Sequence, residues 1–234
     1  TAEHMINLVK SKLKTFVGGI HSREDGKILT QDKKESPLLF PKTVYLFMSQ
    51  HIGAPASPIV KKGDFVKKGQ LVGTAQGFVS ANVHASISGK VADVVPWPHP
   101  ITGVRSPAVV IENCGEDSWI EGMSVASDID LISPDEIRLL IQSAGIVGLG
   151  GATFPTHVKL TPPKDKIIDT VVMNGAECEP YLTCDYRLML EKPHEIIQGL
   201  KLVMKCIGCK KAHIGIEANK SDVYTIFKNI VLND

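Results

Sequence analysis

The chain has 234 residues, which is enough for one or two globular domains. Hydrophobic residues make up 43% and charged residues 22%, and this composition excludes a disordered or fibrous chain. Lys and Arg number 26 against 25 Asp and Glu, so no overall positive field favours nucleic acid as a partner. No apolar run reaches the roughly 18–20 residues that cross a bilayer, and we expect no transmembrane segment.

The texture of the sequence changes along the chain. The residues before Met5 are typical of an expression-tag remnant and are excluded from the fold. Glycine- and proline-rich short runs then give way to longer, helix-like spacing. The expected segments are a tag remnant (residues 1–4), an N-terminal segment (5–38), an all-β domain (39–115), a linker (116–132) and an α/β domain (133–234).

Short apolar runs separated by turn residues dominate the first half. No 3.6-residue period of useful length runs through them, so we expect short strands in a compact all-β unit. The expected strands are Val44–Met48, Pro58–Val60, Phe65–Val66, Leu71–Gly73, Val91–Val95 and Val109–Ile111.

Two segments of this half, Val60–Leu71 and Ala85–Val91, resemble the paired hairpins of biotinyl and lipoyl carrier domains. That resemblance implies a barrel-sandwich hybrid fold. A carrier needs a modifiable lysine at the hairpin tip between the two segments, and residues 73–84 contain no lysine. We therefore expect the fold without the swinging arm. His51 and His84 lack a carboxylate or cysteine pair at ligand spacing, and we interpret them as hydrogen-bonded structural histidines.

The second half alternates strands and helices. Ser133–Glu136 is a helix start, with an N-cap serine, a proline at the first helical position and acids in the first turn. Gly145 is expected to end that helix. The further expected elements are a buried strand at Ile167–Met173, helices within 184–205, a strand at His213–Glu217 and a helix from Ser221. This order predicts a parallel sheet.

A glycine-rich motif follows the first helix, with Gly148, Gly150 and Gly151 within four positions. Glycines let a backbone approach a ligand closely, and their N–H groups can form an anion-binding nest. Lys159 follows at a distance where it could pair with a phosphate. The dinucleotide fingerprint does not fit, because its third glycine would fall on Thr153. The alternative is a purely structural turn.

A polar motif, Asn174–Pro180, stands immediately after the expected buried strand. Ligands of open α/β sheets bind beyond the carboxyl ends of strands, so Asn174, Glu177 and Glu179 are candidate site residues. The alternative is a turn that caps the next helix. We expect no glycosidase chemistry from Glu177 and Glu179, because nothing places them across a cleft from each other.

The five cysteines are too irregular for a secreted disulfide framework, and we expect a reducing environment. Cys206 and Cys209 have the spacing of metal and redox motifs, but no second such pair accompanies them. They fall at the end of a helical pattern that Gly208 stops. We expect them to pack in a core and to hold no metal.

Together these motifs resemble the RnfC family, whose members belong to the Rnf complex, the membrane-bound ion-translocating ferredoxin:NAD oxidoreductase. The matching stretches are Phe16–His21, Gln50–Ala56, the hairpin region, Gly150–Leu160, Asn174–Pro180 and Ile214–Lys220. A weaker similarity extends to the flavin subunit of respiratory complex I. The resemblance implies two domains, a barrel-sandwich hybrid followed by an incomplete, Rossmann-like α/β domain that binds FMN and NADH.

The family's site carries over residue by residue. By resemblance, Gly148, Gly150 and Gly151 line the flavin, and Phe154 contacts the nicotinamide nucleotide. Lys159 meets a phosphate or ribityl oxygen. Around the isoalloxazine or ribityl chain the resemblance places Asn174, Glu177 and Glu179. Four positions depart from the complex I pattern and carry no such role: Leu149, Thr153, Ala176 and Cys178.

The resemblance also implies a function. Such a protein takes electrons from NADH through FMN, and two [4Fe–4S] clusters in a later region pass them on to membrane subunits at the cytoplasmic face. This sequence ends before those cluster motifs, so we expect an N-terminal fragment that is inactive alone. We name no catalytic or metal-binding residue in it. The alternative is a non-catalytic docking module of a membrane redox complex.

Overall fold

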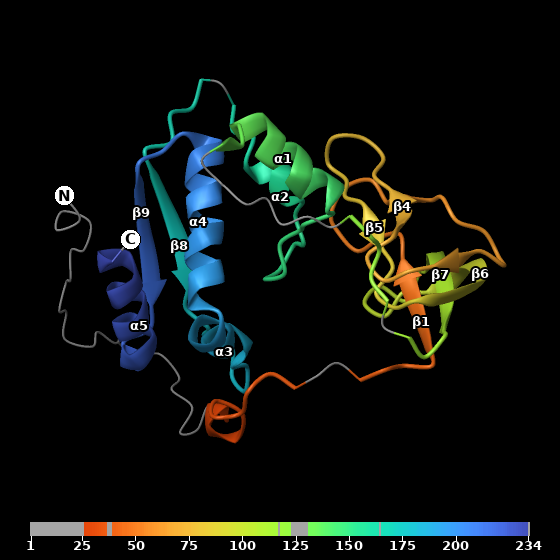
Figure 1. Cartoon of the computed structure of the whole chain (residues 1–234), viewed down its shortest axis with the longest axis horizontal. Helices are drawn as coiled ribbons and strands as arrows, with labels where there is room; N and C mark the ends of the chain where they lie inside the picture. Colours follow the sequence, from red (N-terminus) through yellow and green to blue (C-terminus); the bar gives the residue numbers. More distant parts are fainter. Residues whose placement is uncertain (1–25, 37–38, 117, 123–130, 164, 234) are drawn as a thin grey trace. The chain divides into compact units, whose positions relative to one another are not determined.

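The computed structural model describes residues 26–36, 39–116, 118–122, 131–163 and 165–233. Predictions for the tag remnant, the Phe16–His21 motif and most of the linker lie outside these residues. The chain forms two compact units (Figure 1). The barrel unit is Leu38–Lys166, and the α/β unit combines Thr1–Pro37 with Ile167–Asp234. Each unit is described by itself.

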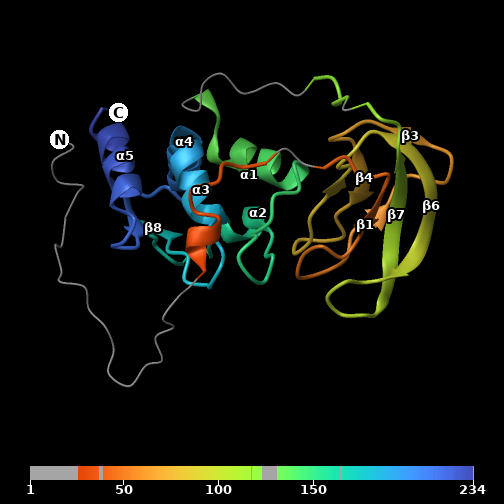
Figure 2. The same ribbon diagram turned by 90° about the horizontal axis from the view of Figure 1, so that it is seen from below.

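The barrel unit contains seven short to medium strands in its described part. They are β1 (Thr43–Phe47), β2 (Ser57–Pro58), β3 (Phe65–Val66), β4 (Leu71–Thr74), β5 (Val83–His84), β6 (Gly89–Pro98) and β7 (Arg105–Asn113). A four-stranded sheet has the order β1-β7-β6-β3, and a three-stranded sheet has the order β2-β4-β5 (Figure 2). All six strands predicted from the sequence are present, although β6 and β7 are longer than predicted.

Small aliphatic side chains fill the core of this unit. The alternating apolar residues of the strands meet between the two sheets, as period-2 patterning requires. Gly89 allows β6 and β7 to approach, because a Cβ on it would lie 1.9 Å from the Glu112 carbonyl oxygen. The fully buried members of the core are Met48, Val66, Val72, Val91, Val109 and Ile111.

Two helices follow the strands within the same unit, α1 (Pro134–Ser143) and α2 (Thr156–Lys159). Helix α1 begins as predicted, with a capping box between Ser133 and Glu136. Gly145 follows it with φ +68°, a left-handed conformation that favours glycine. Both ends of the predicted helix are therefore confirmed.

The α/β unit is built on two parallel strands, β8 (Thr170–Gly175) and β9 (Lys211–Ile216), which run side by side in Figure 1. The connection between them contains α3 (Cys184–Glu191) and α4 (Pro193–Ile207), and α5 (Ser221–Leu232) follows β9. Met189, Val223 and Phe227 form the buried centre of its core. The predicted parallel pairing and the helix from Ser221 are confirmed. The Rossmann-like detail stays a prediction.

The prediction of a buried strand at Ile167–Met173 is wrong. The strand begins at Thr170, Ile167 is 95% exposed, and Val172 is 68% exposed. The core of this unit contacts Met173 on β8 and Ile214 on β9, so alternate strand residues point away from it. A run of apolar residues therefore does not imply burial on both faces here.

An N-terminal segment completes the α/β unit. A 3-10 helix at Lys27–Leu29 lies beside α3 (Figures 1 and 2). The buried Lys27 donates hydrogen bonds from Nζ to the carbonyl oxygens of Glu177 and Leu182. Arg187 Nη1 donates to the Gln31 carbonyl oxygen over 3.1 Å. Residues 26–36 are thus fixed to elements about 150 positions later in the sequence.

Packing divides the chain near residue 166, whereas the sequence predicted a boundary at 116–132. Part of the predicted linker pairs with the barrel, since Lys68 N donates to Ser118 O over 3.1 Å and Ile120 N donates to Lys68 O over 3.0 Å. Residues 133–163 pack in the barrel unit as well. Shared ancestry also defines domains, so the predicted boundaries stay a prediction.

Candidate functional site

The glycine-rich motif forms a closed-neck loop in the barrel unit. Gly148 N donates to Phe154 O over 2.9 Å, and Thr156 N donates to Ile146 O over 3.0 Å. Val147 and Pro155 are bridged between these two bonds. Residues 148–154 therefore project as one loop whose two ends are held together.

The glycines of this loop face open space. A Cβ on Gly150 or Gly151 would meet no heavy atom within 4 Å, so packing inside the described chain does not require glycine there. Gly151 has φ +132°, which side chains rarely adopt. Among the described residues, the N–H groups from Leu149 to Thr153 donate to no backbone carbonyl. The loop thus offers free donors and no Cβ obstruction at these two glycines, as an anion-binding nest requires.

A cation lies against this loop. Lys159 ends α2, and its Nζ is 2.8 Å from where a Cβ of Gly148 would lie. No hydrogen bond or ion pair of this ammonium is found within the described part of the chain. Phe154 is half-buried, and its carbonyl oxygen closes the neck. The barrel unit therefore brings together five predicted site residues: Gly148, Gly150, Gly151, Phe154 and Lys159.

The α/β unit carries the other three predicted residues at the carboxyl end of β8. The exposed Asn174 accepts a hydrogen bond from Ala176 N at Oδ1 over 3.0 Å, which shapes the turn after the strand. Glu179 is exposed, with the Cys178 thiol beside it. Asn174 and Glu179 therefore have side chains that a ligand could reach.

The Glu177 carboxylate is buried and fully engaged. Its Oε1 accepts from Asp185 N over 2.8 Å, and its Oε2 accepts from Tyr186 N over 3.4 Å, so it caps the N-terminus of α3. Burial raises the pKa of Glu177, but these hydrogen bonds, the Cys184 thiol and the charge of Lys220 outweigh it and leave the pKa lower than usual. The side chain makes the helix cap that the sequence offered as an alternative, and its flavin role stays a prediction.

Two lysines that sequence reasoning did not single out surround this turn. Lys220, after β9, places Nζ 3.5 Å from Glu177 Oε2 and 2.8 Å from Glu217 Oε2. The same ammonium lies 5.2 Å from the centre of the Tyr186 ring. Its position at the end of the second parallel strand was the available signal. For Lys27 the sequence offered none, because its partners lie 150 positions away.

Candidate metal ligands also occur here. In the described residues, one group of possible ligand atoms lies within 4.8 Å of one another, and it comprises Glu177, Cys184 and Asp185. Both carboxylate oxygens of Glu177 already accept hydrogen bonds from the start of α3. Burial, followed by the charge of Glu177, raises the pKa of Asp185. This group therefore does not prompt a metal assignment.

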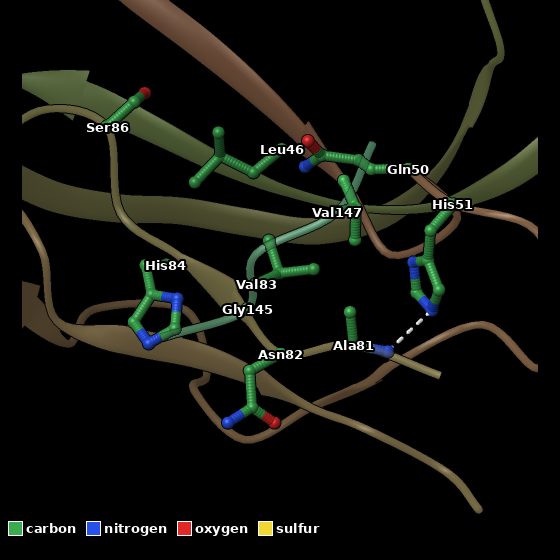
Figure 3. A pocket seen from close by; sticks show the side chains of 10 residues that line it. All are labelled: Leu46, Gln50, His51, Ala81, Asn82, Val83, His84, Ser86, Gly145 and Val147. Atoms are coloured by element: carbon green, nitrogen blue, oxygen red, sulfur yellow. Dashed lines mark hydrogen bonds between the residues drawn. The ribbon is translucent and has the colours of Figure 1, made fainter. Parts of the chain in front are cut away.

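A pocket of about 200 Å³ lies between the barrel strands and the segment that leads into the glycine loop (Figure 3). His51, His84, Asn82, Gly145 and Val147 are among the residues that line it. His51 Nε2 accepts from Ala81 N over 2.8 Å, which confirms its structural role. Burial lowers the pKa of both His51 and His84, so both rings are neutral near pH 7.

The Cys206–Cys209 pair occupies the end of α4, where Gly208 has φ +77°. Both cysteines are buried. Cys209 Sγ lies 3.7 Å from the Lys211 carbonyl oxygen. These surroundings support packing as their role.

The predicted site residues thus fall into two sets, one in each compact unit. The glycine loop and Lys159 belong to the barrel unit, and the Asn174–Glu179 turn belongs to the α/β unit. Contact of a single cofactor with both sets stays a prediction.

Comparison with known proteins accounts for most of the sequence. The family model described as the RnfC barrel sandwich hybrid domain matches residues 14–116. The model described as the Nuo51 FMN-binding domain matches residues 141–234, which include the glycine loop and the polar turn. The barrel-sandwich fold and an FMN-binding type of domain are therefore confirmed.

Curated relatives agree with the family models, and the three described here are all the C component of their complex. The chain is 50% identical over 208 residues to that of the proton-translocating ferredoxin:NAD(+) oxidoreductase complex of Clostridium ljungdahlii, a match that covers 89% of this chain and 45% of the relative. It is 48% identical over 223 residues to the Na(+)-translocating counterpart of Acetobacterium woodii, covering 94% of this chain and 49% of the relative. Identity to the counterpart in the ion-translocating oxidoreductase complex of Rhodobacter capsulatus is 43% over 204 residues, 87% of this chain and 39% of the relative.

The chain spans about half the length of the first two of these relatives. None of the helices in the described residues is long and apolar enough to span a bilayer. Both halves of the sequence match, in order, the domain types expected from their motifs. The chain belongs to the RnfC family of the Rnf-type ferredoxin:NAD oxidoreductase complexes.

Proposed function

We propose that this chain binds FMN with its glycine-rich loop and forms part of the electron-input subunit of an Rnf-type complex. The observation that carries the proposal is the loop of residues 148–154. Space without protein atoms lies at Gly150 and Gly151, and the Lys159 ammonium adjoins the loop with no partner among the described residues. The segment also lies in the match to the FMN-binding domain model.

The chemistry of the loop suits an anionic, planar cofactor. Its free N–H groups would hold phosphate or carbonyl oxygens, and Lys159 would add a charge-assisted hydrogen bond. The Phe154 ring would contact the nicotinamide nucleotide, while Asn174 and Glu179 would bind the ribityl chain or the isoalloxazine edge. Glu177 would support that turn from beneath. Bound FMN supplies the conversion between a two-electron hydride donor and one-electron acceptors.

The wider function rests on the relatives. Their names describe ferredoxin:NAD(+) oxidoreductase complexes that translocate protons or Na(+). By analogy, the protein would exchange electrons between NADH and other Rnf subunits at the cytoplasmic face of the membrane. Two [4Fe–4S] clusters in a region beyond this sequence would act as carriers. The docking-module alternative predicts no flavin affinity at all.

The deciding experiment is a titration of the purified chain with FMN, followed by flavin fluorescence. We expect saturable binding that weakens about ten- to a hundredfold in Lys159→Ala, because a hydrogen bond to a charged group is lost. Lys90→Ala is the matched control, since Lys90 is also an exposed lysine of the barrel unit. A wild-type chain without FMN affinity, or equal affinities in all three proteins, would overturn the assignment.

A further inference from the structure

One hairpin of the barrel contacts both flanks of the glycine loop. The hairpin runs from residue 75 to residue 84, between β4 and the end of β5. On one side its Phe78 carbonyl oxygen accepts a hydrogen bond from Nε2 of the buried His157, over 3.0 Å. The Phe78 ring meets the His157 ring edge-on, with centroids 6.0 Å apart. His157 belongs to α2, which begins directly after the loop.

On the other side, the same hairpin holds the segment before the loop. Asn82 Nδ2 donates to the Ser143 carbonyl oxygen over 3.1 Å, while its Oδ1 accepts from Ala75 N over 2.9 Å. Ser143 ends α1, so its carbonyl lacks a partner within the helix. A single side chain therefore joins the hairpin to an unsatisfied helix end.

The backbone approach at this flank is close. A Cβ on Gly145 would lie 2.3 Å from the Asn82 carbonyl oxygen and 3.3 Å from His84 Nδ1. Gly145 also has φ +68°. Figure 3 shows Asn82 and His84 on the wall of the pocket where Gly145 passes. Only glycine fits both the angle and the space, so the flank is fixed against the barrel.

The neck transmits these contacts to the loop. Because Gly148 N–Phe154 O and Thr156 N–Ile146 O close the neck, a shift of either flank moves residues 148–154 as a unit. We propose that the hairpin of residues 75–84 is a clamp that holds the glycine loop in its flavin-receiving shape, with Asn82 and His157 as positioning residues. This inference rests on the proposed FMN site.

The clamp also gives a role to a hairpin that carrier domains use differently. In a carrier this tip would present a modified lysine, whereas here it has no lysine and is bonded to α1 and α2. The barrel would thereby contribute to cofactor binding without touching the cofactor.

The test combines amide hydrogen exchange with FMN titration on the whole chain. Asn82→Asp keeps the acceptor for Ala75 N and removes the donor to Ser143 O. We expect exchange at Gly148 and Thr156 to accelerate about fivefold and the FMN dissociation constant to rise about fivefold, as for one neutral hydrogen bond.

Asn113→Asp is the matched control. Asn113 makes the same pair of bonds elsewhere in the barrel, accepting from Gly115 N over 2.8 Å and donating to Pro41 O over 2.9 Å. It should lower stability comparably without changing loop exchange or FMN affinity. At the other flank, His157→Leu should act like Asn82→Asp, and His157→Gln, which retains a donor, should restore part of the effect.

The outcomes separate the two proposals. Unchanged loop exchange in Asn82→Asp would overturn the clamp, whatever the flavin does. Faster exchange with unchanged FMN affinity would leave the contact but overturn the positioning role. A wild-type chain that binds no FMN would overturn the proposed function and the positioning role together, and exchange alone would then decide whether the hairpin holds the loop.

Discussion

The Glu177 carboxylate and the Lys220 ammonium lie 3.5 Å apart, with side chains only 2% and 7% exposed. They stand at the carboxyl ends of β8 and β9, so the pair joins two strands that approach each other only in the folded unit. Glu177 also caps α3, and Lys220 precedes α5. One ion pair therefore connects both strands to the two helices that cover their core.

Removal of one partner should destabilise the α/β unit strongly. In Lys220→Met the ionised Glu177 stays buried with fewer compensating charges, and we expect a loss of about 3–5 kcal/mol in the free energy of unfolding. Lys210→Met, at an exposed lysine, is the control and should change it by less than about 0.5 kcal/mol. Urea denaturation followed by circular dichroism measures both. A loss in Lys220→Met no larger than in the control would show that the pair contributes nothing.

The same pair predicts an acid-dependent stability. The pKa of Glu177 is lower in the folded protein than its ordinary value of 4.5. Its contribution is therefore complete above about pH 4.5 and disappears as the pH falls through the lower folded value. Glu177→Gln should be less stable than the wild type at pH 6, and its stability should fall less between pH 5 and pH 3.

Urea midpoints measured at half-unit pH intervals would check this, with Glu179→Gln as the control at an exposed carboxylate in the same turn. Parallel curves for the wild type and Glu177→Gln would contradict the linkage.

The sequence predicted the two halves of the fold for identifiable reasons. Strand and helix starts came from local signals, such as the capping box at Ser133 and the left-handed Gly145. The burial of Ile167 could not be predicted locally, because exposure depends on what covers the sheet. The hairpin contacts of Asn82 and His157 were equally invisible, since a side chain that bonds a distant carbonyl leaves no periodic signal.

The polar turn shows a further limit. Its position after a strand correctly pointed to the sheet edge, and the helix-capping alternative describes what the Glu177 carboxylate does. Its pairing with Lys220 needs the parallel register of β8 and β9, in which Gly175 lies opposite Ile216. Such a register follows from packing across the whole unit.

The barrel should never carry a lipoyl or biotinyl group. Residues 73–84 contain no lysine, and the Phe78 carbonyl at the hairpin tip is bonded to His157. Intact-mass spectrometry of protein expressed with active lipoyl and biotin ligases should show the unmodified mass. An added lipoyl or biotinyl mass mapped to this hairpin would refute the prediction.

The buried cysteines should act only through packing. Replacement of Cys206 and Cys209 by Ala should leave zinc and iron at background and lower the free energy of unfolding by at most a few kcal/mol, because small buried side chains are lost. Elemental analysis beside urea denaturation measures both quantities. Stoichiometric metal in the wild type that disappears in the double variant would overturn this assignment.

The last prediction separates a ligand-binding glycine from a structural one. Gly151 has φ +132° and no heavy atom within 4 Å of where a Cβ would lie, so Gly151→Val should strain the loop locally and obstruct FMN while the fold survives. Gly63→Val is the matched control, because Gly63 also has a positive φ, +97°, and open space around it. Both variants should lose similar stability, about 1–2 kcal/mol, in thermal melts. Isothermal titration should then show FMN binding abolished in Gly151→Val and retained in Gly63→Val, whereas equal FMN affinity in both variants would leave the glycine loop without a role in cofactor binding.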